Sequence, residues 1–288
     1  MENVAYDETG KVDMNGIYDE DAPLAYFTML KELDYMIPQN AQPMFSRLIA
    51  ARRRMSGRQK LKIVDIGCSY GVNAAILKHG LSMAQLYRFY RGGVAQHREA
   101  LMARDRALYS APADENIQFI GLDQARNAIT YAVDAGTLDA GVVTNLEETE
   151  PGPRDRIALA GSDLIISTGC FGYVTETSLE RLLDAAGGSE PWMAHFVLRM
   201  FDFSEAEAML SRHGYVTEKA DGLFIQRRFA SEEERESVFS NLAERGLTPT
   251  AEEEDGWYVA ELYVARPQAQ ARAMPLPALI GDMSMTDN

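Results

Sequence analysis

Residues 62 to 71, Lys-Ile-Val-Asp-Ile-Gly-Cys-Ser-Tyr-Gly, carry the most chemical information in this chain. A short apolar run ends in Asp65, and Gly67, Ser69 and Gly71 follow at alternate positions before a helix-forming stretch. A strand that feeds a small-residue turn and then a helix presents backbone N–H groups to a ligand. The Gly-Lys-Ser/Thr of a P-loop is absent, and a dinucleotide fingerprint would leave the end of the strand apolar. The pattern predicts a ligand-binding turn of another kind, with a tight turn that binds nothing as the alternative.

A second carboxylate, Asp123, ends the next predicted strand and precedes a predicted helix. Ligands of open α/β sheets bind at this carboxyl edge. A carboxylate there can accept hydrogen bonds from both hydroxyl groups of a ribose, which would make Asp123 a nucleoside ligand. Its alternative role is to cap the helix by accepting hydrogen bonds from backbone N–H groups, and one side chain can do both.

Strand-like and helix-like segments alternate along the chain, which predicts a doubly wound α/β sheet. The expected strands are 63–66, 118–122, 142–144, 163–168, 194–200, 222–229 and 257–264. Two helices, 25–35 and 42–55, are expected before the first strand, with a break at 37–40 between them. We expect an N-terminal helical segment over 1–60, a main domain over 61–266 with a helical insertion at 79–114, and a flexible tail over 267–288.

The order acid-x-Gly-x-(Gly/Ser)-x-Gly resembles motif I of the class I S-adenosylmethionine-dependent methyltransferases. In that family the loop holds a cationic amino-acid moiety and a nucleoside, and the fold is a mostly parallel seven-stranded sheet whose last strand is inserted antiparallel. The resemblance covers about residues 60 to 266 and implies S-adenosyl-L-methionine as the cofactor. By this resemblance the cofactor-binding residues are Asp65, Gly67, Ser69, Gly71, Asp123, Gln124, Asn145, Leu146 and Tyr35.

Asn145 follows the third expected strand, where the family usually carries an Asp, Asn or Ser near the adenine amino group. Leu146 would then pack on the adenine face. The alternative for Asn145 is turn chemistry, because an Asn side chain readily bonds its own local backbone.

The fourth expected strand ends in Ser-Thr-Gly-Cys-Phe-Gly-Tyr, residues 167 to 173. Nucleic-acid amino methyltransferases of the family carry Asp/Asn-Pro-Pro-Tyr here, and this chain lacks that group for accepting an exocyclic amine. Tyr173 could offer its phenol or its ring face to a sulfonium or ammonium. We assign Tyr173 and Asn145 to catalysis, with packing on the following helix as the alternative for Tyr173. Cys170 is expected to be a small buried thiol.

Three tyrosines, Tyr18, Tyr26 and Tyr35, precede the sheet. In this family such a segment often folds over the cofactor, so we expect a helical lid with Tyr35 near the pocket. The alternative is an amphipathic helix that packs its aromatic side chains on the core. His195 lies inside a mostly apolar strand, which favours a buried core histidine over a general base.

Composition limits the partners of this chain of 288 residues. Its net charge of −15 argues against a nucleic acid and fits a neutral or cationic small molecule. No apolar run approaches the roughly 20 residues that span a bilayer, and the acidic N-terminus lacks a signal-peptide pattern. Two cysteines and four histidines without metal-ligand spacing argue against a disulfide framework and a metal site. We expect a cytoplasmic protein without membrane partners, and a homodimer is left open.

These observations predict a transferase of small-molecule metabolism or biosynthesis, most simply a methyltransferase. Methyl transfer from a sulfonium needs positioning and exclusion of water more than an acid–base pair, so the sequence does not identify the acceptor. Two alternatives stay open. One is a cyclase in which the cofactor's own amino group attacks its γ-carbon, giving azetidine-2-carboxylate and methylthioadenosine. The other is a non-catalytic nucleoside-binding scaffold.

Overall fold

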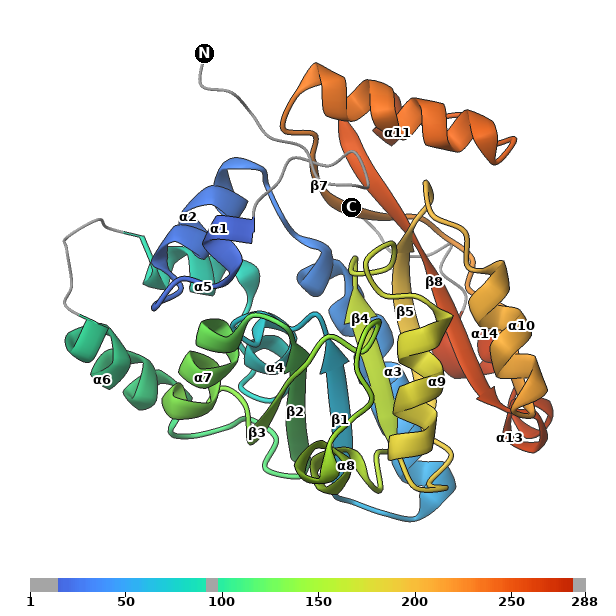
Figure 1. Ribbon diagram of the computed structural model, residues 1–288, viewed down its shortest axis with the longest axis horizontal. Coiled ribbons are helices and arrows are strands. Elements are labelled where there is room, and N and C mark those ends of the chain that lie inside the picture. The colour runs from blue at the N-terminus through green and yellow to red at the C-terminus, as the bar shows by residue number, and fades with distance from the viewer. Residues whose placement is uncertain (1–14, 92–97, 282–288) are drawn as a thin grey trace.

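The computed structural model describes residues 15–91 and 98–281, and within them it shows an α/β fold built on one eight-stranded sheet (Figure 1). The strands are β1 (Leu61–Ile66), β2 (Ile117–Asp123), β3 (Ala140–Val143), β4 (Leu164–Thr168), β5 (Trp192–Leu198), β6 (Tyr215–Lys219), β7 (Phe224–Arg228) and β8 (Trp257–Pro267). Along the order β3-β2-β1-β4-β5 neighbouring strands are parallel, and β8 pairs antiparallel with β5. The predicted doubly wound, mostly parallel sheet with an inserted antiparallel last strand is confirmed.

The outer edge of β8 carries two strands end to end. β6 pairs with its second part, from Tyr263 to Pro267, and β7 pairs with its first part, from Trp257 to Ala260. The path β3-β2-β1-β4-β5-β8-β6 holds six of the seven expected strands, and the seventh, 222–229, is β7, which lies off this path. The sequence reading missed β6 and counted β7 in its place, because Tyr-Val-Thr-Glu-Lys is a short edge strand with little apolar content.

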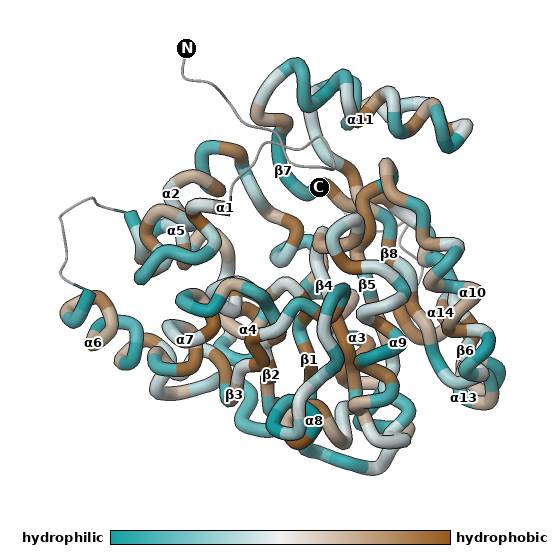
Figure 2. The backbone as a smooth tube through the Cα atoms, in the orientation of Figure 1, coloured by the Kyte–Doolittle hydropathy of each residue, from teal (hydrophilic) through white to brown (hydrophobic). Residues whose placement is uncertain are grey.

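Helices cover both faces of the sheet, and Figure 2 shows the hydrophobic colouring concentrated along the strands between them. They are α1 (Asn15–Tyr18), α2 (Leu24–Glu32), α3 (Ile37–Ser56), α4 (Val72–Leu77), α5 (Met83–Phe89), α6 (Arg98–Tyr109), α7 (Arg126–Ala135), α8 (Pro153–Leu159), α9 (Glu176–Ala185), α10 (Ser204–Arg212), α11 (Glu232–Glu244), α12 (Ala251–Glu254), α13 (Gln268–Ala273) and α14 (Leu276–Ile280). One core lies between the sheet and α3, α4, α7 and α14, and a second lies between the sheet and α8, α9 and α10.

A third core joins the N-terminal helices to the insertion. Buried side chains of α2, among them Phe27 and Leu30, pack with side chains of α4, α5, α6 and α7. The Phe27 and Tyr90 rings stack with their centroids 4.2 Å apart. The two expected helices of the insertion are therefore present as α5 and α6, while residues 92–97 between them lie outside the described residues.

Two expectations about the ends of the chain need correction. Residues 37 to 40 do not break a helix but begin α3, because Pro38 stands in its first turn, where a missing N–H costs nothing. Residues 268 to 280 of the supposed flexible tail form α13 and α14. Leu276 and Ile280 are buried against the core that contains α3. Residues 282–288 lie outside the described residues. In the described part of the chain, no helix is long and apolar enough to span a membrane.

Candidate functional site

The glycine-rich turn lies at the carboxyl edge of the sheet, between β1 and α4. Gly67, Ser69 and Gly71 all have positive φ angles, of 66°, 46° and 79°. The turn is closed by bonds from the Gly67 N–H to Leu122 O, 2.8 Å, and from the Gly71 N–H to Cys68 O, also 2.8 Å. Because a side chain is strained at such φ values, the two glycines are the residues that this backbone requires.

Neighbouring side chains already occupy the space that the two glycines leave. A Cβ on Gly67 would lie 2.8 Å from the Cβ of Cys170, and a Cβ on Gly71 would lie 3.0 Å from Cγ2 of Thr137. The glycines therefore allow the turn to pack on the loop after β4 and on the residues after α7. Contact of their backbone with a ligand stays a prediction.

Asp65 is the most unusual group of the turn because its carboxyl is completely buried. Its Oδ1 accepts a hydrogen bond from Asn73 Nδ2 at 3.0 Å, whereas its Oδ2 has no partner. Burial raises the pKa of Asp65 to about 8, although the Asn73 amide acts in the opposite direction. A second buried oxygen of the same turn, Oγ of Ser69, also has no partner. The end of β1 and the turn after it thus contain two buried side-chain oxygens without a hydrogen-bond partner.

Asp123 lies beside this turn and holds it in place. Its Oδ2 accepts the Ser69 N–H at 2.8 Å, and its Oδ1 accepts the Ala125 N–H at 3.0 Å, at the start of α7. Burial raises the pKa of Asp123, and backbone hydrogen bonds from Ala125, Ser69 and Gln124 lower it only in part. Asp123 therefore bonds the backbone that leads into α7, but the N-cap of this helix is Ala125 and no side chain caps it, so the helix-capping alternative is not realised in its strict form. Gln124, next in the chain, is exposed.

A polar chain runs from Asp65 towards the N-terminal segment. Asn73 also donates to Thr168 Oγ1, 3.1 Å away at the end of β4. Thr168 in turn hydrogen-bonds the hydroxyl of Tyr35, whose pKa is raised above its usual value by burial and by the nearby Tyr18 and Tyr87 hydroxyls. Tyr35 therefore lies at the same edge of the sheet as Asp65, near the predicted cofactor site. Asn73, which links the two through Thr168, was not among the predicted residues.

The N-terminal segment lies over this edge of the sheet (Figure 1). Its residues 19–21 receive hydrogen bonds from three places. Tyr70 of the glycine turn donates to Glu20 O at 2.6 Å, the Asn127 N–H donates to Asp19 Oδ1 at 2.6 Å, and Arg98 donates to Asp21 O at 3.1 Å. The segment thus contacts the glycine turn, the first turn of α7 and the insertion.

The tyrosines of the segment lie close to the candidate ligand groups. Tyr26 is buried against Tyr70, with their ring centroids 5.3 Å apart. Burial, with the nearby Tyr35 and Tyr18 hydroxyls and the Asp123 carboxyl, raises the pKa of Tyr26. The aromatic packing offered as the alternative is present, and the packed rings lie next to the two candidate ligand carboxylates.

Two residues expected near an adenine have local structural roles. Asn145 Oδ1 accepts the Glu147 N–H at 3.0 Å, so the turn alternative is present. Leu146 is 2% exposed and packs in the core between the sheet and α8–α10. The expectation that it presents a free face needs this correction, because its neighbours in the core already cover the side chain.

The loop after β4 places Tyr173 at the surface, with 46% of its area exposed. Cys170 is only partly buried, so the expected buried thiol is corrected to one that packs on Gly67 at the rim. His195 is completely buried and binds Ser167 Oγ through Nδ1 at 2.8 Å. Burial lowers the pKa of His195 to about 3, so the ring is neutral, in agreement with a core histidine. No group of described residues in 15–91 and 98–281 could hold a metal ion.

Known structures similar to this chain include three methyltransferases. The plantazolicin methyltransferase BpumL in complex with SAH is 14% identical, covers 88% of both chains and has a TM-score of 0.40. Magnesium protoporphyrin IX methyltransferase from Synechocystis PCC 6803, with bound SAM, is 11% identical over 79% of this chain and 80% of the other, with a TM-score of 0.39. Precorrin-6y C5,15-methyltransferase from Geobacter metallireducens is 11% identical over 76% and 86%, with a TM-score of 0.36.

No family model matches the chain, and no curated protein matches it significantly.

Proposed function

We propose that this protein is an S-adenosylmethionine-dependent methyltransferase that acts on a neutral or cationic small molecule. The observation that carries the proposal is the Asp65 carboxyl, completely buried at the end of β1 with an Oδ2 that lacks any partner. An ammonium group seated in the glycine turn would donate a charge-assisted hydrogen bond to this oxygen. This bond would give the buried Oδ2 atom a hydrogen-bond partner.

The other predicted ligand residues fit the same cofactor. Asp123 would accept a hydrogen bond from the ribose, and Ser69 Oγ is a second buried oxygen without a hydrogen-bond partner. Asn145 and the exposed Gln124 lie beyond the ends of β3 and β2, on the side where the nucleoside would extend. A net charge of −15 further favours a neutral or cationic acceptor over a nucleic acid.

When bound, the cofactor would supply an activated methyl group to the acceptor, and the acceptor's proton would leave to solvent. The protein's part is to bind, orient and exclude water. The N-terminal segment, including Tyr26 and Tyr35, would exclude water from the carboxyl edge. Tyr173, on the loop after β4, would face the reacting groups from the other side.

Calorimetry with S-adenosylmethionine, followed by product analysis, tests this proposal. Micromolar binding is expected, with S-adenosylhomocysteine formed only when an acceptor is present. Methylthioadenosine formed from the cofactor alone would favour the cyclase instead. Absence of measurable binding would contradict both enzymatic functions. The non-catalytic scaffold would then be the remaining alternative.

A further inference from the structure

A side chain far away in the sequence reaches the end of β4. Gln226 of β7 is 7% exposed, and its amide packs on the turn that follows Thr168. A Cβ on Gly169 would lie 2.0 Å from Nε2 of Gln226, and Gly169 itself has a φ of 77°. The turn has therefore no room for any residue larger than glycine while this amide is in place. This contact could not be predicted from the sequence, because 57 positions separate the two residues.

The backbone of β7 is irregular where it carries this residue. Ile225 lies opposite Val259 and Arg228 lies opposite Trp257, so Gln226 and Arg227 together face the single residue between them. Such a bulge re-aims side chains and is common beside active sites. Here both bulged side chains are buried: Arg227 points to Glu234, with bonds of 2.9 and 2.8 Å, and Gln226 points to the β4 turn.

The place that Gln226 reaches is the acceptor side of the proposed site. Ligands of open sheets bind where the strand order reverses, which here is between β1 and β4. The glycine turn and Asp123 occupy the β1 and β2 side, whereas Thr168 and Gly169 form the β4 side. The turn from residue 167 to 173 contains no amide or carboxylate side chain of its own. Gln226 supplies the missing amide from another strand.

We propose that Gln226 orients the methyl acceptor by accepting a hydrogen bond from its N–H or O–H group. The inference rests on the proposed methyltransferase function and narrows its substrate to amines, phenols and alcohols. The amide does not take up the acceptor's proton, because a neutral amide is not a base; it directs the lone pair of the nucleophile towards the methyl carbon. The main-chain oxygen of Gln226 accepts a hydrogen bond from the Met36 N–H at 2.8 Å. This bond holds β7 against the end of the N-terminal segment.

Three variants separate orientation of the acceptor from structural support of β7. Gln226→Leu removes the polar group, and Gln226→Glu keeps a hydrogen-bond acceptor of the same size. The control is Asn40→Ala, which removes the bond from Asn40 Nδ2 to Ile225 O, 2.8 Å, and leaves the Gln226 amide in place. Each variant is incubated with deuteromethyl-labelled S-adenosylmethionine and a cell extract of small molecules, and labelled products are identified by mass spectrometry. Cofactor affinity and thermal stability are measured in parallel.

The wild type is expected to label an amine, phenol or alcohol. With that compound, Gln226→Leu should lower kcat/KM by about tenfold or more, the loss expected for a buried hydrogen bond left unmade, while cofactor affinity changes by less than about threefold. Gln226→Glu should recover part of the loss, and Asn40→Ala should stay within about threefold of the wild type. Equal rates in Gln226→Leu and the wild type, or a labelled acceptor without N–H or O–H, would overturn the role of Gln226 and leave the methyltransferase proposal intact. Cofactor binding without any labelled product from the wild type would instead overturn the proposed function, and this inference with it.

Discussion

Two segments cover the carboxyl edge of the sheet, and they are fastened in different ways. The first is the N-terminal segment, residues 15–36; the second is the arm formed by β7, α11 and α12, residues 224–254. The first is held at residues 19–21 by hydrogen bonds that involve exposed backbone and carboxylate groups. The second is held by buried ion pairs, among them Arg227 with Glu234 and Arg199 with Glu253.

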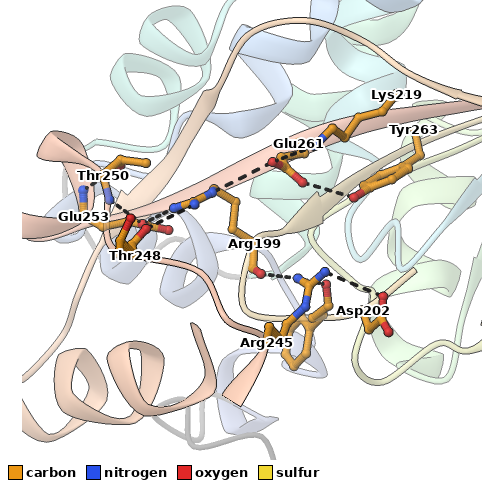
Figure 3. A network of polar contacts seen from close by, with 10 residues as sticks. Arg199, Asp202, Lys219, Arg245, Thr248, Thr250, Glu253, Glu261 and Tyr263 are labelled. Atoms are coloured by element: carbon orange, nitrogen blue, oxygen red, sulfur yellow. Dashed lines mark hydrogen bonds and ion pairs between the residues drawn. The ribbon is translucent and has the colours of Figure 1, made fainter. Parts of the chain in front are cut away.

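Figure 3 shows how the arm is tied to the end of β5. Arg199 pairs with Glu253 of α12 and with Glu261 of β8. Arg245, at the end of α11, donates to the carbonyl oxygens of Arg199 and Phe201. The Phe201 ring in turn lies against Gly172 of the loop after β4, where a Cβ would be 2.5 Å from the ring. The arm is therefore a wall that positions the β4 loop.

The two segments differ in how much free energy it costs to open them. Opening the arm would expose paired charges that were buried together, which is costly. Opening residues 19–21 exchanges surface hydrogen bonds for bonds to water, whereas opening α2 would also expose the buried side chains of Tyr26, Phe27 and Leu30. The two covers meet where the Arg228 N–H donates to Leu33 O and the Met36 N–H to Gln226 O, both at 2.8 Å. This junction belongs to the arm, and α2 is packed in the third core, so a moving lid would end before Leu24.

The largest expected effect is on stability and comes from removing a buried ion pair of the arm. Arg227→Met leaves Glu234, which is completely buried, without its cation, and we expect the free energy of unfolding in urea to fall by about 3–5 kcal/mol. The double variant Arg227→Met/Glu234→Leu should recover most of this loss. The matched control is the exposed pair of Arg235 and Glu232, whose carboxylate side chain is 64% exposed. Glu232→Gln should change stability by less than about 0.5 kcal/mol. If the buried and the exposed pair had equal effects on stability, the arm would not be held more firmly than the N-terminal segment.

The next largest effect is expected at the buried carboxyl of Asp65. Asp65→Asn keeps the shape and the bond partner Asn73 but removes the negative charge offered to the cofactor's ammonium. Affinity for S-adenosylmethionine should fall by about 1.5–3 kcal/mol, roughly ten- to 150-fold, in calorimetry. Ser56→Ala, on the far end of α3, serves as a neutral control. Unchanged affinity in Asp65→Asn would show that the buried carboxyl does not meet the ligand.

The pH dependence of the same affinity follows from the raised pKa of Asp65, about 8. Below this pH the carboxyl of the free protein is protonated, and binding an ammonium favours the carboxylate, so affinity should rise with pH up to about 8, by no more than tenfold per unit. Stability of the free protein runs the other way: because the folded pKa lies above the unfolded value, the contribution of Asp65 is present at low pH and is lost as pH rises through about 8. Asp65→Asn should flatten both slopes. Asp123→Asn measures how much of each pH dependence comes from Asp123, whose pKa is also raised.

The sequence predicted the parts of this site that depend on local pattern. The β1–turn–α4 unit, the acid at the end of β2 and the two helices of the insertion follow from apolar periodicity and from glycine positions, and all are present. Gln226 and Asn73 could not be predicted, because their roles depend on contacts between elements distant in the chain or on which face of a helix meets a strand. Leu146 was misjudged for the same reason, since its position after β3 does not reveal the core that covers it.

The smallest expected effect is on proteolysis at residues 19–21 and tests whether the N-terminal segment moves. Residues 19–21, Asp-Glu-Asp, are exposed and can be cut by a protease specific for acidic residues, while the exposed Glu232 and Glu233 of the wall provide internal reference sites on the same molecule. We expect S-adenosylmethionine to slow cleavage at 19–21 at least threefold, equivalent to about 0.65 kcal/mol, and to leave cleavage at 232–233 unchanged. Asn127→Ala, which removes the bond from Asn127 Nδ2 to Asp19 O, 2.9 Å, should speed cleavage of the free protein at 19–21 only. If the cofactor protects both segments equally, its effect is general stabilisation by binding and the N-terminal segment is ordinary packing; if it protects neither while still binding, the segment is no lid.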